Sequence, residues 1–445
     1  MLNSITYSLR GALDEAVREE VKLWNADGRV EKIWDKDALA WTGEDEGRWL
    51  GWLHVIAEQL KELARYRDFH ADIESAGFTD VLLMGMGGSS LCPEVLAITF
   101  GKTNFHILDS TVPAQIKATE GKIDLAKTLF IVASKSGSTL EPNCFKQYFF
   151  DKVSQISREP GKQFVAITDP GSKMEQIAKT DAFRYIFYGD PEIGGRFSAL
   201  SAFGLTAAAA MGLDVEILLN RAGEMADACR SIDTNENPGA LLGTVLGVAH
   251  RHGRDKLTIF AAPEIYDLGA WLEQLIAEST GKSDIAIIPV DREPILDVDE
   301  YYDDRVFVYL SVKGGKTDEG VYNKLEAIER SEHPLIRIEL ESIYHISQEF
   351  FRWEFATAVA GWIMGINPFN QPDVESAKIE ARKLTDEYEK QGKLPDEKPF
   401  FEDGGISLFS GEAYAERLQG LTGDNSLAGL IRAHLEEIGK RDYFA

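Results

Sequence analysis

Residues 80–90 read DVLLMGMGGSS, and this stretch decides the fold class. A short apolar, β-rich run leads directly into three glycines and two serines. A buried strand that ends in a glycine-rich turn before a helix is typical of open α/β sheets. Similar β-rich runs alternate downstream with helix-like segments, at 105–108, 128–133, 164–168 and 185–188. This alternation predicts a doubly wound, mostly parallel sheet.

A second series of β-rich runs follows a mostly helical stretch at 200–249. The runs lie at 257–262, 285–290, 306–312 and 335–339. Two long helices are predicted after them, at about 348–364 and 374–391, with a polar break at 397–404 and a last amphipathic helix at 427–438. We therefore expect two α/β units of similar type with helical extensions.

These patterns divide the chain into five expected parts. They are a helical N-terminal layer at 1–75, a first α/β domain at 76–215, a helical connection at 216–250, a second α/β domain with further helices at 251–395, and a C-terminal helical segment at 396–445.

The charge balance narrows the class of partner. The 445 residues include 47 Lys and Arg against 73 Asp and Glu, a formal net charge of −26. Duplex nucleic acid and anionic lipid both need a basic face, so neither is expected as a partner. The three cysteines form no CxxC motif, and neither a secretory h-region nor an apolar run of about 20 residues occurs. We expect a cytoplasmic protein with no membrane span and a small-molecule substrate.

Residues 134–141, SKSGSTLE, follow the predicted strand at 128–133. Four hydroxyls, one lysine and one glycine within six residues open a helix there, which suits a phosphate group. Hydroxyls and backbone amides would donate hydrogen bonds, and the helix dipole would favour the dianion. The alternative is an ordinary helix N-cap, although a cap needs one hydroxyl. The motif GxxxxGK[ST] is absent, which disfavours nucleotide hydrolysis.

The glycine-rich turn at 85–90 has two interpretations. Its glycines could bring backbone N–H groups close to an anion, or they could simply form a tight turn. A dinucleotide fingerprint is a competing interpretation, because Asp109 follows the next predicted strand. However, Ser90 occupies the position of the third glycine.

Two further segments carry charged residues suited to catalysis. Arg196 lies in GGRFS at 194–198, where paired glycines would let its guanidinium approach a ligand and stabilise an oxyanion. Glu278 lies in QLIAESTGK at 274–282, near an apolar helix end, where it could act as a base. A surface arginine and an exposed last-turn glutamate are the respective alternatives.

The segment INPFNQPDVESAK at 366–378 interrupts two predicted helices. Gln371 and Lys378 could point toward one ligand. The alternative is a helix–turn–helix corner with Lys378 as a solvated cation.

Taken together and in order, these segments resemble the glucose-6-phosphate isomerase family. GMGGSSLCP is similar to the family's GIGGSxLGP, SKSGSTLEP to SKTxTTxET, GGRFS to GGRxS, QLIAESTGK to QLxxESNGK, and INPFNQPDVESAK to INxFDQxGVExGK. The run FRWEFATAVAG before INPFNQPDVE is most similar to the isomerase half of transaldolase/glucose-6-phosphate isomerase fusions, although no transaldolase barrel is present. The resemblance implies two sugar-isomerase (SIS) domains with helical extensions.

The resemblance also implies a reaction: reversible conversion of glucose 6-phosphate to fructose 6-phosphate through a cis-enediolate, without a metal or redox cofactor, in a homodimer. It implies that Glu278 moves the proton between C1 and C2, that Arg196 stabilises the enediolate, and that Lys378 assists at the ring oxygen. The residues implied to bind the phosphate are Ser134, Lys135, Ser136 and Thr139. Those implied to line the sugar are Gly88, Ser89, Gly195, Gln274 and Gln371.

One family feature is missing from its usual place. The family commonly uses a histidine between the base and the final lysine to open the sugar ring, and 282–332 contains none. His333 and His345 lie outside the motifs and inherit no role. One hypothesis is that the chain is a fragment, or a natural short form, without the C-terminal segment that supplies this histidine in fusion-type relatives.

Three other functions are compatible with these residues. An isomerase that accepts mannose 6-phosphate would use the same enediolate. A SIS-type regulatory protein would bind a phosphosugar without turnover, and a dinucleotide enzyme is a third class. The joint presence of a base and two cations, rather than the phosphate loop alone, favours catalysis.

Overall fold

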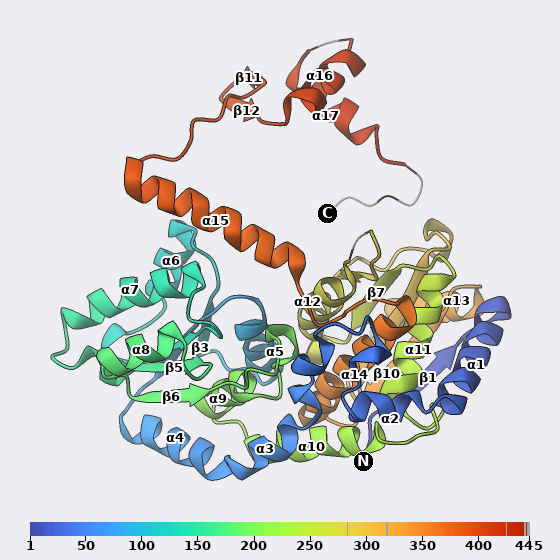
Figure 1. Cartoon of the computed structure of the whole chain (residues 1–445), viewed down its shortest axis with the longest axis horizontal. Coiled ribbons are helices and arrows are strands. Elements are labelled where there is room, and N and C mark those ends of the chain that lie inside the picture. The colour runs from blue at the N-terminus through green and yellow to red at the C-terminus, as the bar shows by residue number, and fades with distance from the viewer. Residues whose placement is uncertain (283, 317–318, 424, 440–441, 443–445) are drawn as a thin grey trace. The chain divides into compact units, whose positions relative to one another are not determined.

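The structure is a computed structural model that describes residues 1–282, 284–316, 319–423, 425–439 and 442. The chain divides into two compact units, residues 1–370 and residues 371–445. Among the residues described, the first unit contains two five-stranded sheets, and the second contains a two-stranded hairpin with three helices. Figure 1 shows the elements of both units.

The first sheet is entirely parallel, with the strand order β3-β2-β4-β5-β6. Its strands are β2 (Asp80–Met84), β3 (Phe105–Leu108), β4 (Thr128–Ala133), β5 (Phe164–Thr168) and β6 (Tyr185–Tyr188). Strands β3 to β6 have the bounds predicted from the sequence, and β2 covers the apolar run that opens residues 80–90. The chain leaves β2 on one side for β3 and returns on the other side as β4, so the carboxyl ends of β2 and β4 flank a topological switch point. Ligands of open α/β sheets bind at such points.

Both faces of this sheet are buried, as the apolar runs require. In β4, Leu129 and Ile131 face the large core of the first unit, whereas Phe130 and Val132 face a smaller core. That smaller core is covered by α7 (Leu140–Ser154) and α8 (Lys173–Thr180), which are visible beside β5 in Figure 1. The sheet is therefore the middle layer of three.

The second sheet has the order β1-β10-β9-β7-β8. Its strands are β1 (Ser4–Ser8), β7 (Lys256–Ala261), β8 (Ile288–Asp291), β9 (Arg305–Val312) and β10 (Leu335–Leu340). From β8 to β10 it repeats the parallel topology of the first sheet, which confirms the prediction of two similar α/β units. Strand β8 starts three residues later than the predicted run at 285–290.

Strand β1 corrects the expectation that the first 75 residues are helical. It pairs antiparallel with β10 at the edge of the second sheet, with Ile5 opposite Ile338. Ile5 and Tyr7 pack against the large core. A five-residue strand with serine at both ends carries too weak an alternation to be recognised in the sequence.

The helices of the first unit cover both sheets. They are α1 (Gly11–Ala26), α2 (Arg29–Trp34), α3 (Val55–Lys61), α4 (Leu63–Ser75), α5 (Leu91–Thr99), α6 (Pro113–Glu120), α7 (Leu140–Ser154), α8 (Lys173–Thr180), α9 (Ala202–Ala210), α10 (Val215–Ala228), α11 (Pro238–Arg251), α12 (Leu268–Thr280), α13 (Glu319–Arg330) and α14 (Ile346–Met364). Helix α14 is buried along almost its whole length and packs along α11 (Figure 1). Two short 3₁₀ helices matter for the site, η4 (Gly87–Ser89) and η7 (Gly195–Phe197).

The second unit consists of α15 (Pro372–Gln391), the hairpin β11 (Phe401–Asp403) and β12 (Ile406–Leu408), α16 (Glu412–Leu421) and α17 (Leu427–Leu435). Its small core contains Leu418, Leu430 and Ala433. The hairpin lies partly in the stretch at 397–404 that we expected to be a polar break. The five-part division of the chain stays a proposal; its part at 251–395 spans the boundary between the two units.

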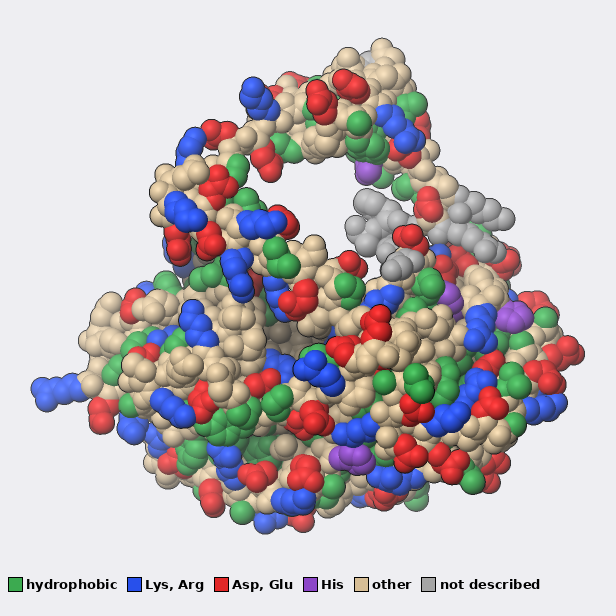
Figure 2. All heavy atoms as spheres, in the orientation of Figure 1, with side chains coloured by type: hydrophobic (Ala, Val, Ile, Leu, Met, Phe, Trp, Pro, Cys, Tyr) green, Lys and Arg blue, Asp and Glu red, His purple; other side chains and the backbone are tan. Residues whose placement is uncertain are grey.

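Surface charge and helix length concern the binding of charged partners and the crossing of a membrane. On the face shown in Figure 2, Lys and Arg side chains are interspersed with Asp and Glu. Within the described residues, each helix is too short or too polar to cross a membrane.

Candidate active site

The glycine-rich loop after β2 lies against two other predicted segments. A Cβ atom on Gly88 would lie 2.1 Å from the carbonyl O of Gly195, and one on Gly87 would lie 2.6 Å from Nε2 of Gln274. Gly87 also has a positive φ of 53°. Glycine is therefore needed at both positions, because the loop packs closely on η7 and on α12.

The same loop also touches the segment that carries the hydroxyls. A Cβ atom on Gly85 would lie 3.3 Å from the carbonyl O of Ala133, the last residue of β4. Residues 134–139 start directly after it. The loop at 85–90 thus joins the phosphate-loop candidate on one side to η7 and α12 on the other, at the switch point of the first sheet.

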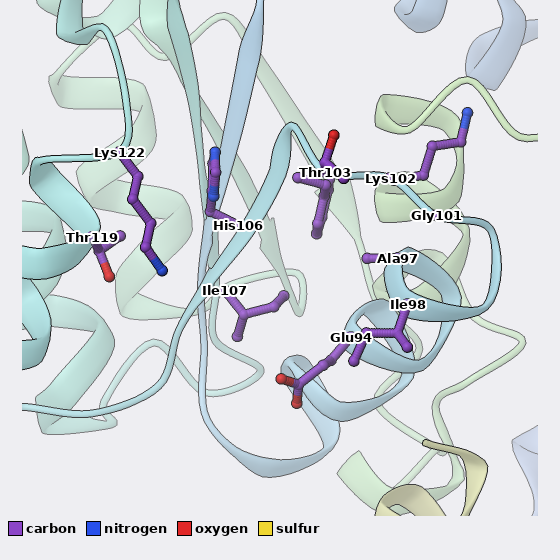
Figure 3. Close-up of a pocket in the computed structure, with 11 residues that line it drawn as sticks. Glu94, Ala97, Ile98, Gly101, Lys102, Thr103, His106, Ile107, Thr119 and Lys122 are labelled. Carbon is purple, nitrogen blue, oxygen red and sulfur yellow. The ribbon is translucent and has the colours of Figure 1, made fainter. Parts of the chain in front are cut away.

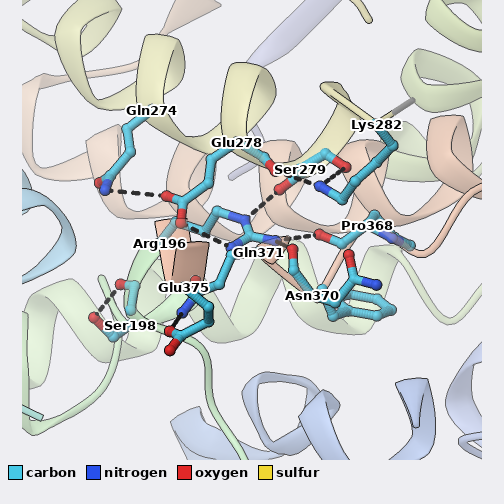
Figure 4. Close-up of polar contacts among 12 residues, drawn as sticks. Arg196, Ser198, Gln274, Glu278, Ser279, Lys282, Pro368, Asn370, Gln371 and Glu375 are labelled. Carbon is cyan, nitrogen blue, oxygen red and sulfur yellow. Dashed lines mark hydrogen bonds and ion pairs between the residues drawn. The ribbon is translucent and has the colours of Figure 1, made fainter. Parts of the chain in front are cut away.

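Arg196 in η7 is buried, with a relative exposure of 2 %. Its Nε donates a hydrogen bond to Oγ of Ser279 at 2.6 Å, and its NH2 group donates to the carbonyl oxygens of Pro368 (2.6 Å) and Asn370 (3.0 Å) (Figure 4). Burial lowers the pKa of Arg196 to about 10, against the opposing effect of Glu278. The guanidinium therefore keeps its charge at neutral pH in a fixed orientation, and a surface location is excluded.

Glu278 lies beside that guanidinium near the end of α12. Its Oε1 is 3.4 Å from NH1 of Arg196, and its side chain keeps 19 % of its exposure. The other carboxylate oxygen accepts a hydrogen bond from Nε2 of Gln274 at 3.3 Å. Oε1 of Gln274 is buried and makes no hydrogen bond to any described residue. A carboxylate, a fixed cation and an amide acceptor thus converge in one place.

The turn at 366–370 fixes the carbonyls that hold Arg196. Oδ1 of Asn367 accepts hydrogen bonds from the backbone N–H groups of Phe369 (3.0 Å) and Asn370 (3.2 Å), and its Nδ2 donates to Asp45 at 3.1 Å. The side chain of Asn367 therefore shapes the turn. No role for Asn367 is predicted from the sequence, although it lies inside the segment at 366–378.

The hydroxyls at 134–139 are arranged differently from an ordinary cap. Thr139 is the N-cap of α7, yet its side chain makes no capping hydrogen bond. Oγ of Ser134 is buried and has no partner among the described residues. Ser136 and Ser138 share a 2.7 Å hydrogen bond between their exposed side chains. Thr139 therefore does not act as the side-chain cap that the alternative interpretation expects, and the binding of a phosphate by these hydroxyls stays a prediction.

Lys135 has a protein partner in this loop. Its Nζ donates to Oδ2 of Asp169 at 2.5 Å and to the carbonyl O of Asp190 at 2.9 Å. Burial raises the pKa of Asp169, while Lys135 opposes this shift. Sequence reasoning missed Asp169; its position directly after β5, at the carboxyl end of the sheet, was the available signal.

Two predicted site residues belong to the second unit. Nζ of Lys378, half-exposed on α15, pairs with Glu375 at 2.9 Å. Gln371, just before α15, donates to the same carboxylate at 3.4 Å. The roles implied for Gln371 and Lys378 stay predictions.

The two histidines without a family role have structural surroundings of their own. His345 pairs with Oγ of Ser342 at 2.8 Å, and His333 packs against the ring of Phe307. Burial lowers the pKa of both imidazoles. Across the described part of the chain, no three His, Cys, Asp or Glu side chains are grouped as metal ligands would be.

The fold of the first unit, two doubly wound sheets of repeated topology, is also found in solved structures of other proteins. The structure is similar to that of a hypothetical protein from Thermus thermophilus, with a TM-score of 0.75 and 23 % identity over 86 % of this chain and 99 % of the other. It is also similar to a glucose-6-phosphate isomerase from Chlamydia trachomatis, with a TM-score of 0.70 and 19 % identity over 87 % of this chain and 89 % of the other.

Sequence comparisons identify the family. A family model described as phosphoglucose isomerase matches residues 52–290, more than half of the chain. The glucose-6-phosphate isomerase of Methanocaldococcus jannaschii is 27 % identical over 68 % of this chain and 83 % of its own length. That of Gloeothece citriformis is 34 % identical over 56 % of this chain and 52 % of its own length. The chain belongs to the phosphoglucose isomerase family.

Proposed function

We propose that this chain catalyses the reversible isomerisation of glucose 6-phosphate and fructose 6-phosphate through a cis-enediolate. Its relatives in M. jannaschii and G. citriformis carry the name of this activity. The observation that carries the proposal is the pair formed by Glu278 and Arg196, 3.4 Å apart beside the glycine-rich loop. An aldose–ketose shift needs one carboxylate that accepts and returns a proton, and a fixed cation close by.

Glu278 is the proposed base. Its carboxylate takes the proton from C2 of the open-chain aldose and returns it to C1, while the hydroxyl proton passes from O2 to O1. No atom is gained or lost, so the reaction needs no redox partner. A single carboxylate serves both carbons only from one face of the sugar, which is why the intermediate is a cis-enediolate.

Arg196 is the proposed stabiliser of the negative charge on the enediolate oxygens. Oγ of Ser279 and the carbonyl oxygens of Pro368 and Asn370 accept hydrogen bonds from the guanidinium and hold it in a fixed plane. A preoriented charge in a buried site stabilises a transition state without reorganisation at the moment of reaction. The support for this role is the burial of Arg196 next to the base.

The phosphate is assigned to residues 134–139. Ser134, Ser136 and Thr139 would donate their hydroxyls, and the first N–H groups of α7 would add the favourable end of the helix dipole. Because Lys135 is paired with Asp169, we propose that it contributes mainly through its backbone and through the local field.

The remaining assignments rest on the sequence resemblance. We propose that Gly88, Ser89, Gly195, Gln274 and Gln371 line the sugar. Oε1 of Gln274 is buried and has no hydrogen-bond partner within the described part of the chain, which supports its share of this role.

We propose further that Lys378 assists at the ring oxygen. A homodimer and kinship with the isomerase half of transaldolase fusions are proposed from the same resemblance, and a cytoplasmic location is proposed from the cysteine pattern.

A coupled assay with fructose 6-phosphate, in which the glucose 6-phosphate formed is oxidised by an NADP-dependent dehydrogenase, tests the function. The wild-type chain should turn over, and Glu278→Gln should lose at least about 10³-fold in kcat while it still binds glucitol 6-phosphate. Glucitol 6-phosphate binding without turnover by the wild-type chain would instead indicate a regulatory phosphosugar-binding protein. Mannose 6-phosphate in the same assay measures the alternative substrate.

A further inference from the structure

We propose that Ser279 is a positioning residue that holds Arg196 at a working distance from Glu278. The inference rests on the isomerase activity proposed above and concerns a residue to which that proposal gives no role. Ser279 follows Glu278 directly in α12, and its side chain is fully buried. Its Oγ accepts the hydrogen bond from Nε of Arg196 at 2.6 Å (Figure 4).

The hydrogen bonds of the Arg196 guanidinium are shorter than its distance to the carboxylate of Glu278. Three neutral acceptors hold Nε and NH2 at 2.6–3.0 Å, whereas NH1 stays 3.4 Å from the carboxylate of Glu278. A direct charge-assisted hydrogen bond between such groups is ordinarily about 2.7–2.9 Å long. The guanidinium is therefore kept beside the carboxylate, but short of a close ion pair.

This separation has a chemical consequence. In a close, bidentate pair the carboxylate would accept two N–H donors and become a weaker base. The same N–H groups would no longer be available to the enediolate oxygens. By holding the Nε edge of Arg196, Ser279 keeps the guanidinium oriented beside the carboxylate but short of a close ion pair, so that Glu278 can take a proton while the positive charge stays near the developing enediolate.

The last turn of α12 gives Ser279 a firm position. Nζ of Lys282 donates to the carbonyl oxygens of Glu278 (2.5 Å) and Ser279 (3.1 Å). Lys282 is itself buried. An ammonium at the C-terminal carbonyls of a helix donates hydrogen bonds to them and interacts favourably with the negative end of the helix dipole. The base and the serine that positions its partner therefore belong to one rigid turn.

The neighbouring residue supplies a matched control. Oγ1 of Thr280, also buried, donates to the carbonyl oxygens of Ile276 (2.8 Å) and Ile287 (3.1 Å). Thr280→Val removes a buried hydroxyl from the same helical turn without removing a partner of Arg196. Ser279→Ala removes that partner, and Ser279→Thr keeps the oxygen.

The experiment measures kcat and KM for fructose 6-phosphate and the binding of two inhibitors. Glucitol 6-phosphate is uncharged at C1 and C2, whereas a five-carbon aldonic acid phosphate carries a planar carboxylate that imitates the enediolate. We expect Ser279→Ala to lower kcat and the affinity for the aldonic acid by about 10- to 100-fold, because a misplaced charge loses that much. KM and the affinity for glucitol 6-phosphate should change by less than about threefold. Ser279→Thr should restore most of kcat, and Thr280→Val should lower the unfolding temperature while keeping kcat.

Three results would overturn the proposal: an unchanged kcat in Ser279→Ala, an equal loss of both inhibitors, or an equal loss of kcat in Thr280→Val. A wild-type chain without turnover would refute the proposed function instead, so the two failures are distinguishable.

Discussion

Arg196→Lys tests how far the fixed plane of the guanidinium, rather than its charge, supports catalysis. Lysine keeps one positive charge, but a single ammonium cannot reach Ser279, Pro368 and Asn370 together from the direction in which Arg196 holds them. At least one of these buried acceptors would lose its donor. Each such loss costs about 1–3 kcal/mol of folding free energy.

The kinetic loss follows from the same geometry. Removing one preoriented donor from an oxyanion site typically costs about 10²–10³-fold in kcat, or about 2.7–4 kcal/mol. Because lysine keeps the charge, we expect the lower end, a fall of about 100-fold, with KM for fructose 6-phosphate nearly unchanged.

The coupled assay gives kcat and KM, and urea unfolding gives the free energy of unfolding. Arg196→Gln, which lacks the charge, is the matched comparison and should lose more activity than Arg196→Lys. A kcat for Arg196→Lys within about threefold of wild type would refute the argument that the held guanidinium stabilises the transition state.

Three other changes have defined outcomes. Gly88→Ala should lower both kcat and the unfolding temperature, because its Cβ would lie 2.1 Å from the carbonyl O of Gly195 and displace η7. Steady-state kinetics and a thermal melt of this variant would measure the two losses. Ser136→Ala should raise KM for fructose 6-phosphate by about 10-fold, since a hydrogen bond to a charged group contributes about 1.5–3 kcal/mol, while the affinity for phosphate-free glucitol stays unchanged in a binding titration. The hydrogen bond from Arg184 lowers the pKa of Asp72 in the folded state. The pair therefore stabilises the folded protein fully above the pKa of an unfolded aspartate, about 3.9, and this stabilisation is lost as the pH falls through the lower pKa of Asp72 in the folded protein. Asp72→Asn should therefore reduce the free energy of unfolding more at pH 7 than at pH 3, and equal losses at both would contradict the sign.

The buried strands are the part of the fold that the sequence predicts best. The run at 128–133 is apolar throughout because both faces of β4 are covered, and glycine- or serine-rich loops mark its neighbours. Strand β1 is not predicted from the sequence, because the formation of a short edge strand depends more on pairing with β10 than on its own residues. The β11–β12 hairpin is missed for the same reason, with three residues in each strand.

The contacts within the candidate site are the part that the sequence does not predict. The roles proposed for Glu278 and Arg196 follow from residue type and motif. Their environment does not, because Arg196 is held by backbone carbonyls of residues 368 and 370, which are remote in sequence. A carbonyl oxygen has no signature in the sequence. Ser279 could have been noticed as the neighbour of the base, but its contact with Arg196 depends on the packing of η7 against α12.

Incorporation of solvent deuterium tests the central claim most directly. Fructose 6-phosphate is incubated with the chain in D₂O, and deuterium at C1 and C2 is followed by proton NMR. If Glu278 carries the proton between the two carbons, the wild-type chain should incorporate deuterium into the sugar, because the carboxyl proton exchanges with solvent while the enediolate is bound. Glu278→Gln should bind the sugar phosphate and incorporate none. Deuterium incorporation by Glu278→Gln at the wild-type rate would contradict the account.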